Sequence, residues 1–176
     1  MDLKSAYKKL AGDNNIFHGY IFFGNDIDRQ LDFVLCLANF LENNDWRIPI
    51  KPLIDCLLIK FGKEESIGID EVRNIKSFLW QKPFISSRKT LIIKNADRLT
   101  AIGQNALLKI IEEPPPSGLI ILITKNQNSL IPTLLSRFQK VYIASSPANG
   151  KIESSLLIGV KNFLKGSERE KINIIK

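Results

Sequence analysis

Short apolar runs alternate along this chain with longer amphipathic segments. The apolar runs predict five buried strands, over residues 20–23, 55–60, 90–93, 119–124 and 140–143. The amphipathic segments predict helices over residues 28–42, 70–80 and 100–113, with a short one over 130–135. Strands that alternate with helices of this length build a mostly parallel sheet with helices on its faces. The pattern therefore predicts an α/β fold of three layers.

Local signals mark the ends of two of these helices. Asp70 and Thr100 each stand where a side-chain oxygen can accept a hydrogen bond from the first turn of a helix. Pro114 follows the helix that Thr100 begins, and two further prolines come directly after it. Proline has no amide hydrogen and clashes with the preceding turn, so the helix must end there.

The last part of the chain has a different character. Residues 145–150 are rich in serine, proline and glycine, which predicts a hinge. Residues 151–165 predict one more helix, and a polar, charged tail follows. We therefore expect one α/β domain over residues 1–144, followed over 145–176 by a hinge and the start of a further helical unit.

Composition is typical of a globular protein, with 44% hydrophobic and 24% charged residues. No stretch approaches the ~20 apolar residues of a membrane helix, and the polar start of the chain is unlike a signal peptide. We therefore expect a cytoplasmic protein without a membrane partner. Cys36 and Cys56 lie in apolar runs, and with a single histidine they are too few for a zinc site, so no metal is expected.

The net charge of +7 permits contact with nucleic acid or with an acidic partner. It leaves open a free-standing basic module that binds nucleic acid. Proteins that bind single strands in this way stack bases on exposed aromatic side chains. The phenylalanines here lie mostly in segments patterned for the core, which argues against that alternative.

The end of the first predicted strand is the position of a phosphate-binding loop. A working loop has the pattern GxxxxGK[ST], in which backbone N–H groups surround phosphate, the lysine neutralises charge and the hydroxyl holds Mg²⁺. Counted from Gly24, the second glycine is replaced by Arg29, the lysine by Gln30 and the hydroxyl residue by Leu31. We interpret the segment as a structural turn.

The third predicted strand ends where such folds carry the acids that bind Mg²⁺ and activate water. Lys94 stands in place of the metal-binding acid and Asn95 in place of the catalytic glutamate. A lysine beside the Mg²⁺ position repels the ion at close range. Both halves of an ATP-hydrolysing site are therefore replaced, and no nucleotide cofactor is expected. A competent ATPase with a divergent loop is the alternative, which a direct ATP-binding measurement tests.

Four stretches carry a resemblance to a known family: SIGIDEVR at 66–73, NALLKIIEEPP at 105–115, Thr124, and IPTLLSR at 131–137. Together they resemble the AAA+ subunits of the bacterial DNA polymerase III clamp loader. The resemblance implies an AAA+ core with a P-loop-type nucleotide-binding fold over 1–144 and the start of a helical lid within 145–176, with the collar domain absent. Within the family, the degenerate loop favours the delta-prime type over the gamma/tau ATPase type.

Some positions differ from the family's usual pattern. Phe138 stands where the motif around Arg137 usually has cysteine, and we expect its ring to pack where a thiol would. The four-cysteine zinc module of many relatives is missing. Thr124 stands at the family's sensor position, and in a site without ATP we expect it to end the strand or to hydrogen-bond the backbone.

The resemblance assigns the sharpest role to Arg137, with Ser136 before it in the same motif. In the family this arginine reaches the γ-phosphate of ATP on a neighbouring subunit. A guanidinium suits the role because it is permanently charged and binds phosphate oxygens through two N–H groups at once. Without the resemblance, the residues favour a surface arginine that caps the short helix before it.

The candidate DNA contacts are more widely spread. The helix over 100–113 could bring Gln104 and Asn105 towards a DNA phosphate. Arg73, Arg98 and Lys109 are further candidates, with solvated charge as the alternative for each.

The resemblance also implies the partners: the gamma/tau ATPase subunits and the delta subunit of the clamp loader, the sliding clamp through the complex, and primer-template DNA. The leading hypothesis is therefore a non-hydrolysing subunit. It would complete the AAA+ ring and supply Arg137 to a neighbouring ATPase during clamp loading.

Overall fold

The computed structural model describes residues 2–60 and 69–144, with side chains from residue 74 onward in the second range. Its elements are α1 (Leu3–Gly12), β1 (Gly19–Phe23), α2 (Ile27–Asn43), β2 (Cys56–Lys60), α3 (Ile69–Trp80), β3 (Lys89–Lys94), η1 (Ala96–Arg98), α4 (Ala101–Glu112), β4 (Gly118–Thr124), η2 (Gln127–Ser129), α5 (Pro132–Leu135) and β5 (Gln139–Tyr142). None of the helices in these ranges is long and apolar enough to cross a membrane.

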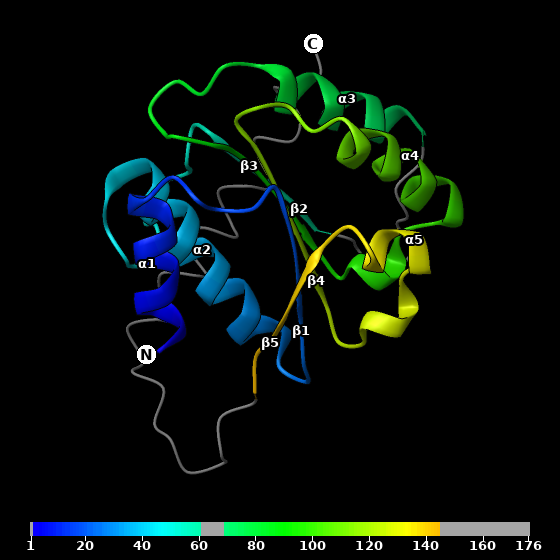
Figure 1. Cartoon of the computed structure of the whole chain (residues 1–176), viewed down its shortest axis with the longest axis horizontal. Coiled ribbons are helices and arrows are strands. Elements are labelled where there is room, and N and C mark those ends of the chain that lie inside the picture. Colours follow the sequence, from blue (N-terminus) through cyan, green and yellow to red (C-terminus); the bar gives the residue numbers. More distant parts are fainter. Residues whose placement is uncertain (1, 61–68, 145–176) are drawn as a thin grey trace.

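The strands form one parallel sheet in the order β2-β3-β4-β1-β5. The first strand of the chain thus lies between the last two. Helices cover both faces of the sheet, with α1 and α2 on one side and α3, α4 and α5 on the other (Figure 1). The predicted three-layer α/β fold is confirmed.

Alternate side chains of the strands fill two separate cores. On the side of α1 and α2, Tyr20 and Phe22 of β1 pack with Leu31 of α2. On the other side, Ile21 of β1 packs with Leu107 of α4. Strand β4 is buried along its whole length, as expected for a central parallel strand between two helical layers.

Helix α1 is an element that the hydrophobic pattern does not predict. Tyr7 is its fully buried residue, and its ring lies 5.4 Å from that of Tyr20 and 5.6 Å from that of Phe33. Most of the helix faces solvent, so its apolar period is weak. A local signal exists at its start, where Asp2 Oδ1 accepts a hydrogen bond from the Ser5 N–H at 2.6 Å.

The predicted helix caps have different outcomes. Thr100 caps α4 as predicted, because its Oγ1 accepts a hydrogen bond from the Gly103 N–H at 3.0 Å. The prediction for Asp70 is wrong, because α3 begins at Ile69 and Asp70 is already inside the helix. The predicted hinge over 145–150 and helix over 151–165 lie outside the described residues.

The carboxyl ends of β1, β3 and β4 lie side by side because these strands are parallel and adjacent. Phe23 pairs with Thr124, and Lys94 pairs with Ile123. Ligands of open α/β sheets bind at this edge. The fold therefore brings the candidate nucleotide residues, which are far apart in the sequence, to one place.

Candidate functional site

The turn after β1 is shaped by a close approach of two strands. Gly24 has a φ of 146°, a conformation that residues with a Cβ rarely adopt. A Cβ at this position would overlap the carbonyl oxygen of Ile143, directly after β5. The N–H of Ile143 donates to the Phe23 carbonyl at 2.9 Å. Contact between these two strands explains the glycine without any phosphate, which agrees with the interpretation as a structural turn.

The three residues in the key positions of the loop all serve the fold. Gln30 is fully buried, and its Nε2 donates to the Gly24 carbonyl at 2.8 Å. Leu31 is 1% exposed and belongs to the core under α2. Arg29 is exposed, and its backbone N–H donates to Asp26 Oδ1 at 3.0 Å. The Asp26 carboxylate therefore binds one of the backbone N–H groups that a phosphate loop leaves for its ligand, whereas the Gln30 amide donates to a carbonyl of the same turn.

Lys94, in place of the metal-binding acid, forms an ion pair with an acid of α2. Its Nζ lies 2.7 Å from Asp28 Oδ1, with the Lys94 side chain 18% exposed and that of Asp28 84% exposed. Burial, together with the charges of Asp28 and Asp26, raises the pKa of the neighbouring Asp32 to about 6, although the charge of Lys94 opposes the shift. Carboxylates thus gather where a triphosphate would add more negative charge.

Asn95, in place of the catalytic glutamate, makes a turn. Its φ of 58° and ψ of 52° are left-handed, a conformation in which asparagine is enriched among non-glycine residues. Its carbonyl accepts a hydrogen bond from the Arg98 N–H at 3.0 Å and so closes η1. Asp97 lies inside η1, and its Oδ1 lies 3.5 Å from the Thr124 hydroxyl at the end of β4.

Thr124 ends β4 and is fully buried. Its hydroxyl donates to the Asn126 carbonyl at 3.1 Å, and the Asn126 N–H donates back to Oγ1 at 3.3 Å. The prediction that Thr124 hydrogen-bonds the backbone at the end of the strand is confirmed.

The side chains at this edge do not suit magnesium and a nucleoside triphosphate. The lysine, hydroxyl and acidic groups of a working site are replaced: Gln30 bonds the backbone, Leu31 packs in the core and Lys94 pairs with Asp28. The described ranges also hold no group of three or more histidine, cysteine or acidic residues placed to bind a metal. We therefore assign no chemical step to this edge.

Arg137 lies on the surface after α5, held by two acceptors. Nη1 donates to the Thr133 carbonyl at 3.1 Å, and Nη2 donates to Glu112 Oε1 at 3.0 Å. The Arg137 side chain is 40% exposed. The Ser136 hydroxyl donates to the same Thr133 carbonyl at 3.0 Å. The guanidinium is therefore partly exposed, and its contact with Thr133 caps α5, as the alternative interpretation requires.

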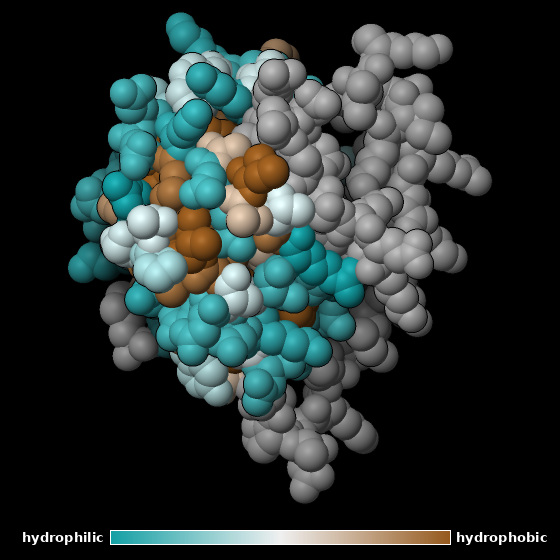
Figure 2. Space-filling model, turned by 90° about the vertical axis from the view of Figure 1, so that its right-hand side faces the viewer, coloured by the Kyte–Doolittle hydropathy of each residue, from teal (hydrophilic) through white to brown (hydrophobic). Residues whose placement is uncertain are grey.

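The face that carries α4 and α5 has mixed polarity. Figure 2 shows apolar patches on it, surrounded by polar surface. Ile102 of α4 is 60% exposed, and Ile131 and Leu135 are half-buried. Such a mixture is common to protein surfaces in general, so polarity alone does not mark this face as an interface.

Phe138, directly after Arg137, is 5% exposed and packs in the core beneath α3, α4 and α5. Its ring lies against Gly19, where an added Cβ would come within 2.9 Å of the ring. The prediction that this ring packs inside is confirmed.

Gln104 is not placed to contact DNA, which corrects the prediction. It is 5% exposed, its Nε2 donates to the Leu99 carbonyl at 3.1 Å, and its Oε1 accepts from the Ile131 N–H at 2.8 Å. Both ends of the amide are therefore occupied within the chain. The helical period places this residue on the core-facing side of α4, so it is a packing residue.

The other candidate DNA residues lie on three elements, α4, η1 and α3. Asn105 and Lys109 are exposed on α4, and Arg98 is exposed in η1. Arg73 belongs to α3, and its side chain is outside the described part of the chain. These candidates remain predictions.

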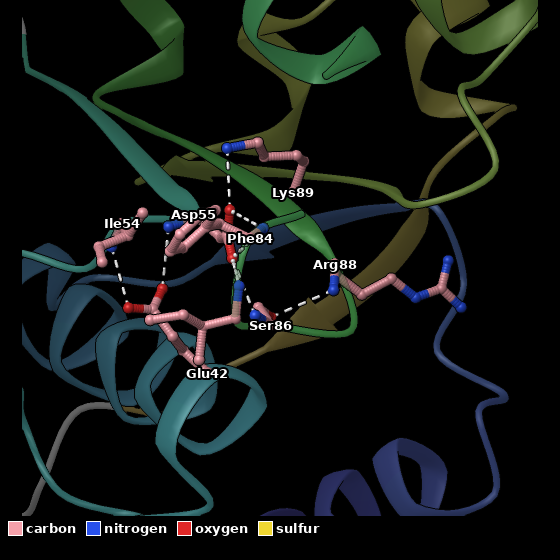
Figure 3. Close-up of polar contacts among 8 residues, drawn as sticks. Glu42, Ile54, Asp55, Phe84, Ser86, Arg88 and Lys89 are labelled. Carbon is pink, nitrogen blue, oxygen red and sulfur yellow. Dashed lines mark hydrogen bonds and ion pairs between the residues drawn. The ribbon is translucent and has the colours of Figure 1, made fainter. Parts of the chain in front are cut away.

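A polar cluster that the sequence pattern does not reveal lies at the amino edge of the sheet, around Asp55. The Asp55 side chain is fully buried and accepts hydrogen bonds from the backbone N–H groups of Phe84, Ile85 and Ser86 at 2.7–2.9 Å. Lys89 Nζ lies 2.9 Å from Asp55 Oδ1 (Figure 3). Burial alone would raise the pKa of Asp55, but hydrogen bonds from Lys89 and the backbone lower it to about 2.

Glu42 of α2 extends this cluster. Its two carboxylate oxygens accept hydrogen bonds from the N–H groups of Ile54 and Asp55, each at 2.9 Å (Figure 3). The cluster thereby ties the loop before β2 to the loop before β3. It lies at the opposite edge of the sheet from the nucleotide position, so its role is to hold the fold.

The fold and the turn after β1 define the general class of this protein. A parallel sheet of this order, with helices on both faces and a first strand that turns into α2 at the ligand-binding edge, is a three-layer α/β fold that solved structures of DNA polymerase III and clamp-loader proteins share. The sequence narrows the class further. Residues 2–147 match the family described as DNA polymerase III, delta subunit. The chain belongs to this family of clamp-loader proteins, as the motifs in the sequence predicted.

Individual relatives agree with this assignment. The chain is 28% identical over 148 residues to DNA polymerase III subunit delta' of Bacillus subtilis, a match that covers 78% of this chain and 45% of the relative. It is 27% identical over 172 residues to the gamma/tau subunit of Mycoplasma genitalium, a match that covers 90% of this chain and 27% of that relative. The solved structure of a gamma subunit-related protein of Thermotoga maritima gives a TM-score of 0.67 at 28% identity, covering 93% and 55%. The chain spans less than half the length of these two curated relatives.

Proposed function

We propose that this chain is a non-hydrolysing, delta-prime-like clamp-loader subunit that completes an AAA+ ring and supplies Arg137 to ATP on a neighbouring subunit. One contrast carries the proposal. The nucleotide edge of the chain is closed by its own contacts, whereas Arg137 is held at the surface by acceptors 3.0 and 3.1 Å away. A subunit built in this way acts on ATP only in trans. An arginine supplied in trans raises the rate about 10³–10⁵-fold in well-studied NTPases.

The partners in this proposal are the gamma/tau ATPase subunits, the delta subunit, the sliding clamp through the complex and primer-template DNA, all in the cytoplasm. Membership of the clamp-loader family and the names of its relatives support the association with other subunits. The net charge of +7 supports contact with DNA.

A nucleotide titration tests the first half of the proposal. Calorimetry with ATP and Mg²⁺ should show no binding tighter than about 1 mM, and the chain alone should not hydrolyse ATP. The second candidate is a divergent ATP-binding subunit of the gamma/tau type, which the 27% identity over 90% of the chain favours. Micromolar binding with turnover would establish that candidate instead.

Reconstitution tests the second half. Arg137→Ala should leave the melting temperature and co-elution with the clamp-loader ATPase of the same organism unchanged, yet lower DNA-stimulated ATP hydrolysis and clamp loading. Arg137→Lys should rescue poorly, because an ammonium lacks the planar fork of donors. Arg29→Ala is the matched control, since this exposed arginine lies at the chain's own nucleotide edge. A folded, assembled Arg137→Ala complex with full activity would remove the trans-acting role.

A further inference from the structure

We propose that Glu112 is a positioning residue, which holds the Arg137 guanidinium where it meets the phosphate of a neighbouring subunit. The inference rests on the proposed function and adds to it a residue that acts through the arginine. It starts from a contact between the end of α4 and Arg137, which follows α5, at the surface of the α4–α5 face.

Two acceptors from two elements fix the guanidinium. The Thr133 carbonyl, 3.1 Å from Nη1, belongs to the same short helix that leads into Arg137. Glu112, 3.0 Å from Nη2, belongs instead to α4, whose Leu107 and Ile111 are buried in the core. The first contact ties the side chain only to its own turn. The second sets its position relative to the body of the domain.

The location of Glu112 is unfavourable unless it has a partner. It is the last residue of α4, where unpaired carbonyl groups give the helix end a partial negative charge that repels a carboxylate. Glu113 follows as the C-cap residue, so two acids meet at this end. The ion pair with Arg137 offsets the repulsion at Glu112. Glu112 therefore stands at a position that is unfavourable for the helix but suitable for binding the Arg137 guanidinium.

Positioning affects rate because a free arginine samples many rotamers. This rotamer freedom is lost when the guanidinium binds a phosphate in the transition state. A side chain that is already anchored loses less conformational entropy at that step. The pair remains accessible, with side-chain exposures of 51% for Glu112 and 40% for Arg137. Two of the guanidinium nitrogens contact the protein, and a planar group with five N–H donors keeps others for a phosphate.

The experiment compares Glu112→Ala and Glu112→Gln with Glu113→Ala in the reconstituted clamp loader. Glu113 is the matched control because it is the neighbouring exposed acid and its removal changes the net charge equally. We expect Glu112→Ala to lower kcat of DNA-stimulated ATP hydrolysis about fivefold, the upper range for a solvent-exposed ion pair, without changing KM for ATP. The kcat of Glu112→Gln should lie between those of Glu112→Ala and the wild type, because the glutamine amide oxygen still accepts a hydrogen bond. Glu113→Ala should match the wild type.

A double-mutant cycle separates positioning from general support. In the Arg137→Ala background, Glu112→Ala should cause no further loss of kcat, because Glu112 acts only through the arginine. Losses that multiply would show an independent role and refute the inference. A rise in kcat would show that Glu112 restrains the arginine, and would refute it equally. The isosteric Glu112→Gln variant keeps the comparison valid if Glu112→Ala folds poorly.

The two levels of the proposal fail in different ways. If Arg137→Ala reduces ATP hydrolysis but neither variant of Glu112 does, the positioning role is wrong and the trans-acting arginine stands. If Arg137→Ala has no effect in a folded and assembled complex, the proposed function is wrong and the role of Glu112 is wrong with it.

Discussion

Replacing Asp55 with asparagine tests how strongly one buried carboxylate holds the amino edge of the sheet. The carboxylate accepts hydrogen bonds from the N–H groups of residues 84–86 and from Lys89. Asparagine keeps one acceptor oxygen and turns an amide NH₂ group towards these donors. Lys89, whose side chain is 6% exposed, would remain buried without its counter-charge.

Two arguments set the size of the effect. Removing one partner of a buried ion pair costs about 3–5 kcal/mol, because the other charge stays buried without compensation. The pKa of Asp55 falls from 3.8 to about 2, which corresponds to roughly 2 kcal/mol of stabilisation of the charged form. We therefore expect Asp55→Asn to lower the free energy of unfolding by about 2–4 kcal/mol, a large share of the ~5–15 kcal/mol of a typical domain.

The assay is urea unfolding followed by circular dichroism at neutral pH. Asp45→Asn is the matched control, because Asp45 is exposed and pairs with the exposed Arg47 at 2.8 Å, so its loss should cause no measurable change. The pH dependence is a second readout. The folded-state pKa of Asp55 lies below the unfolded one, so its stabilisation is complete above about pH 4 and disappears as the pH falls towards about 2.

Two results would refute this reasoning. One is a stability of Asp55→Asn equal to that of the wild type at neutral pH. The other is a difference between the two proteins that stays constant as the pH falls from about 5 to about 2.5, because that difference could not come from the charge on this carboxylate.

The remaining predictions concern single positions. Gly24→Ala should lower the free energy of unfolding by at least about 2 kcal/mol, because the new Cβ meets the Ile143 carbonyl at a positive φ; Gly12→Ala, with nothing within 4 Å of its Cβ, should cost nothing in the same urea titration. Gln104→Ala should destabilise by about 1–3 kcal/mol, because it leaves two buried backbone groups without partners, and should not weaken DNA binding. Lys109→Ala should weaken DNA binding, as measured by fluorescence anisotropy at several salt concentrations. The slope of the logarithm of the binding constant against the logarithm of the salt concentration should become smaller in magnitude by about 1.

The elements that were predicted correctly are those with strong burial patterns. Strand β4 is buried at every position and reads as a continuous apolar run, whereas α2 buries an apolar stripe that recurs with the helical period. Helix α1 was missed because a single fully buried tyrosine leaves no period to read. The cap at Asp70 was wrong because helix ends are set by a few local contacts, which the sequence places only to within a residue or two.

The candidate site divides in the same way. The replacement of the phosphate-loop residues by Arg29, Gln30 and Leu31 was visible in the sequence, because a phosphate loop has a fixed spacing. The contacts that replace it were not, because the Lys94–Asp28 pair joins residues 66 apart, and only the folded sheet brings them together. Asp55 was hidden for the same reason, with its partner Lys89 lying 34 residues on. The burial of Gln104 was readable, since it lies one turn before Leu107 and two before Ile111 on the buried side of α4.

The strand order has a consequence for how the chain is made. Strand β1 is complete at Phe23, but its neighbours β4 and β5 begin only at Gly118 and Gln139. At ribosomal rates of about 5–20 residues per second, β1 waits roughly 5–20 s for its first partner. Meanwhile β2 and β3 can pair only with each other, as an isolated two-stranded unit. The centre of the sheet therefore closes only when β4 has been made, and β5 is added at the edge afterwards. Until then the nascent chain must keep the aromatic, apolar strand β1 from aggregating.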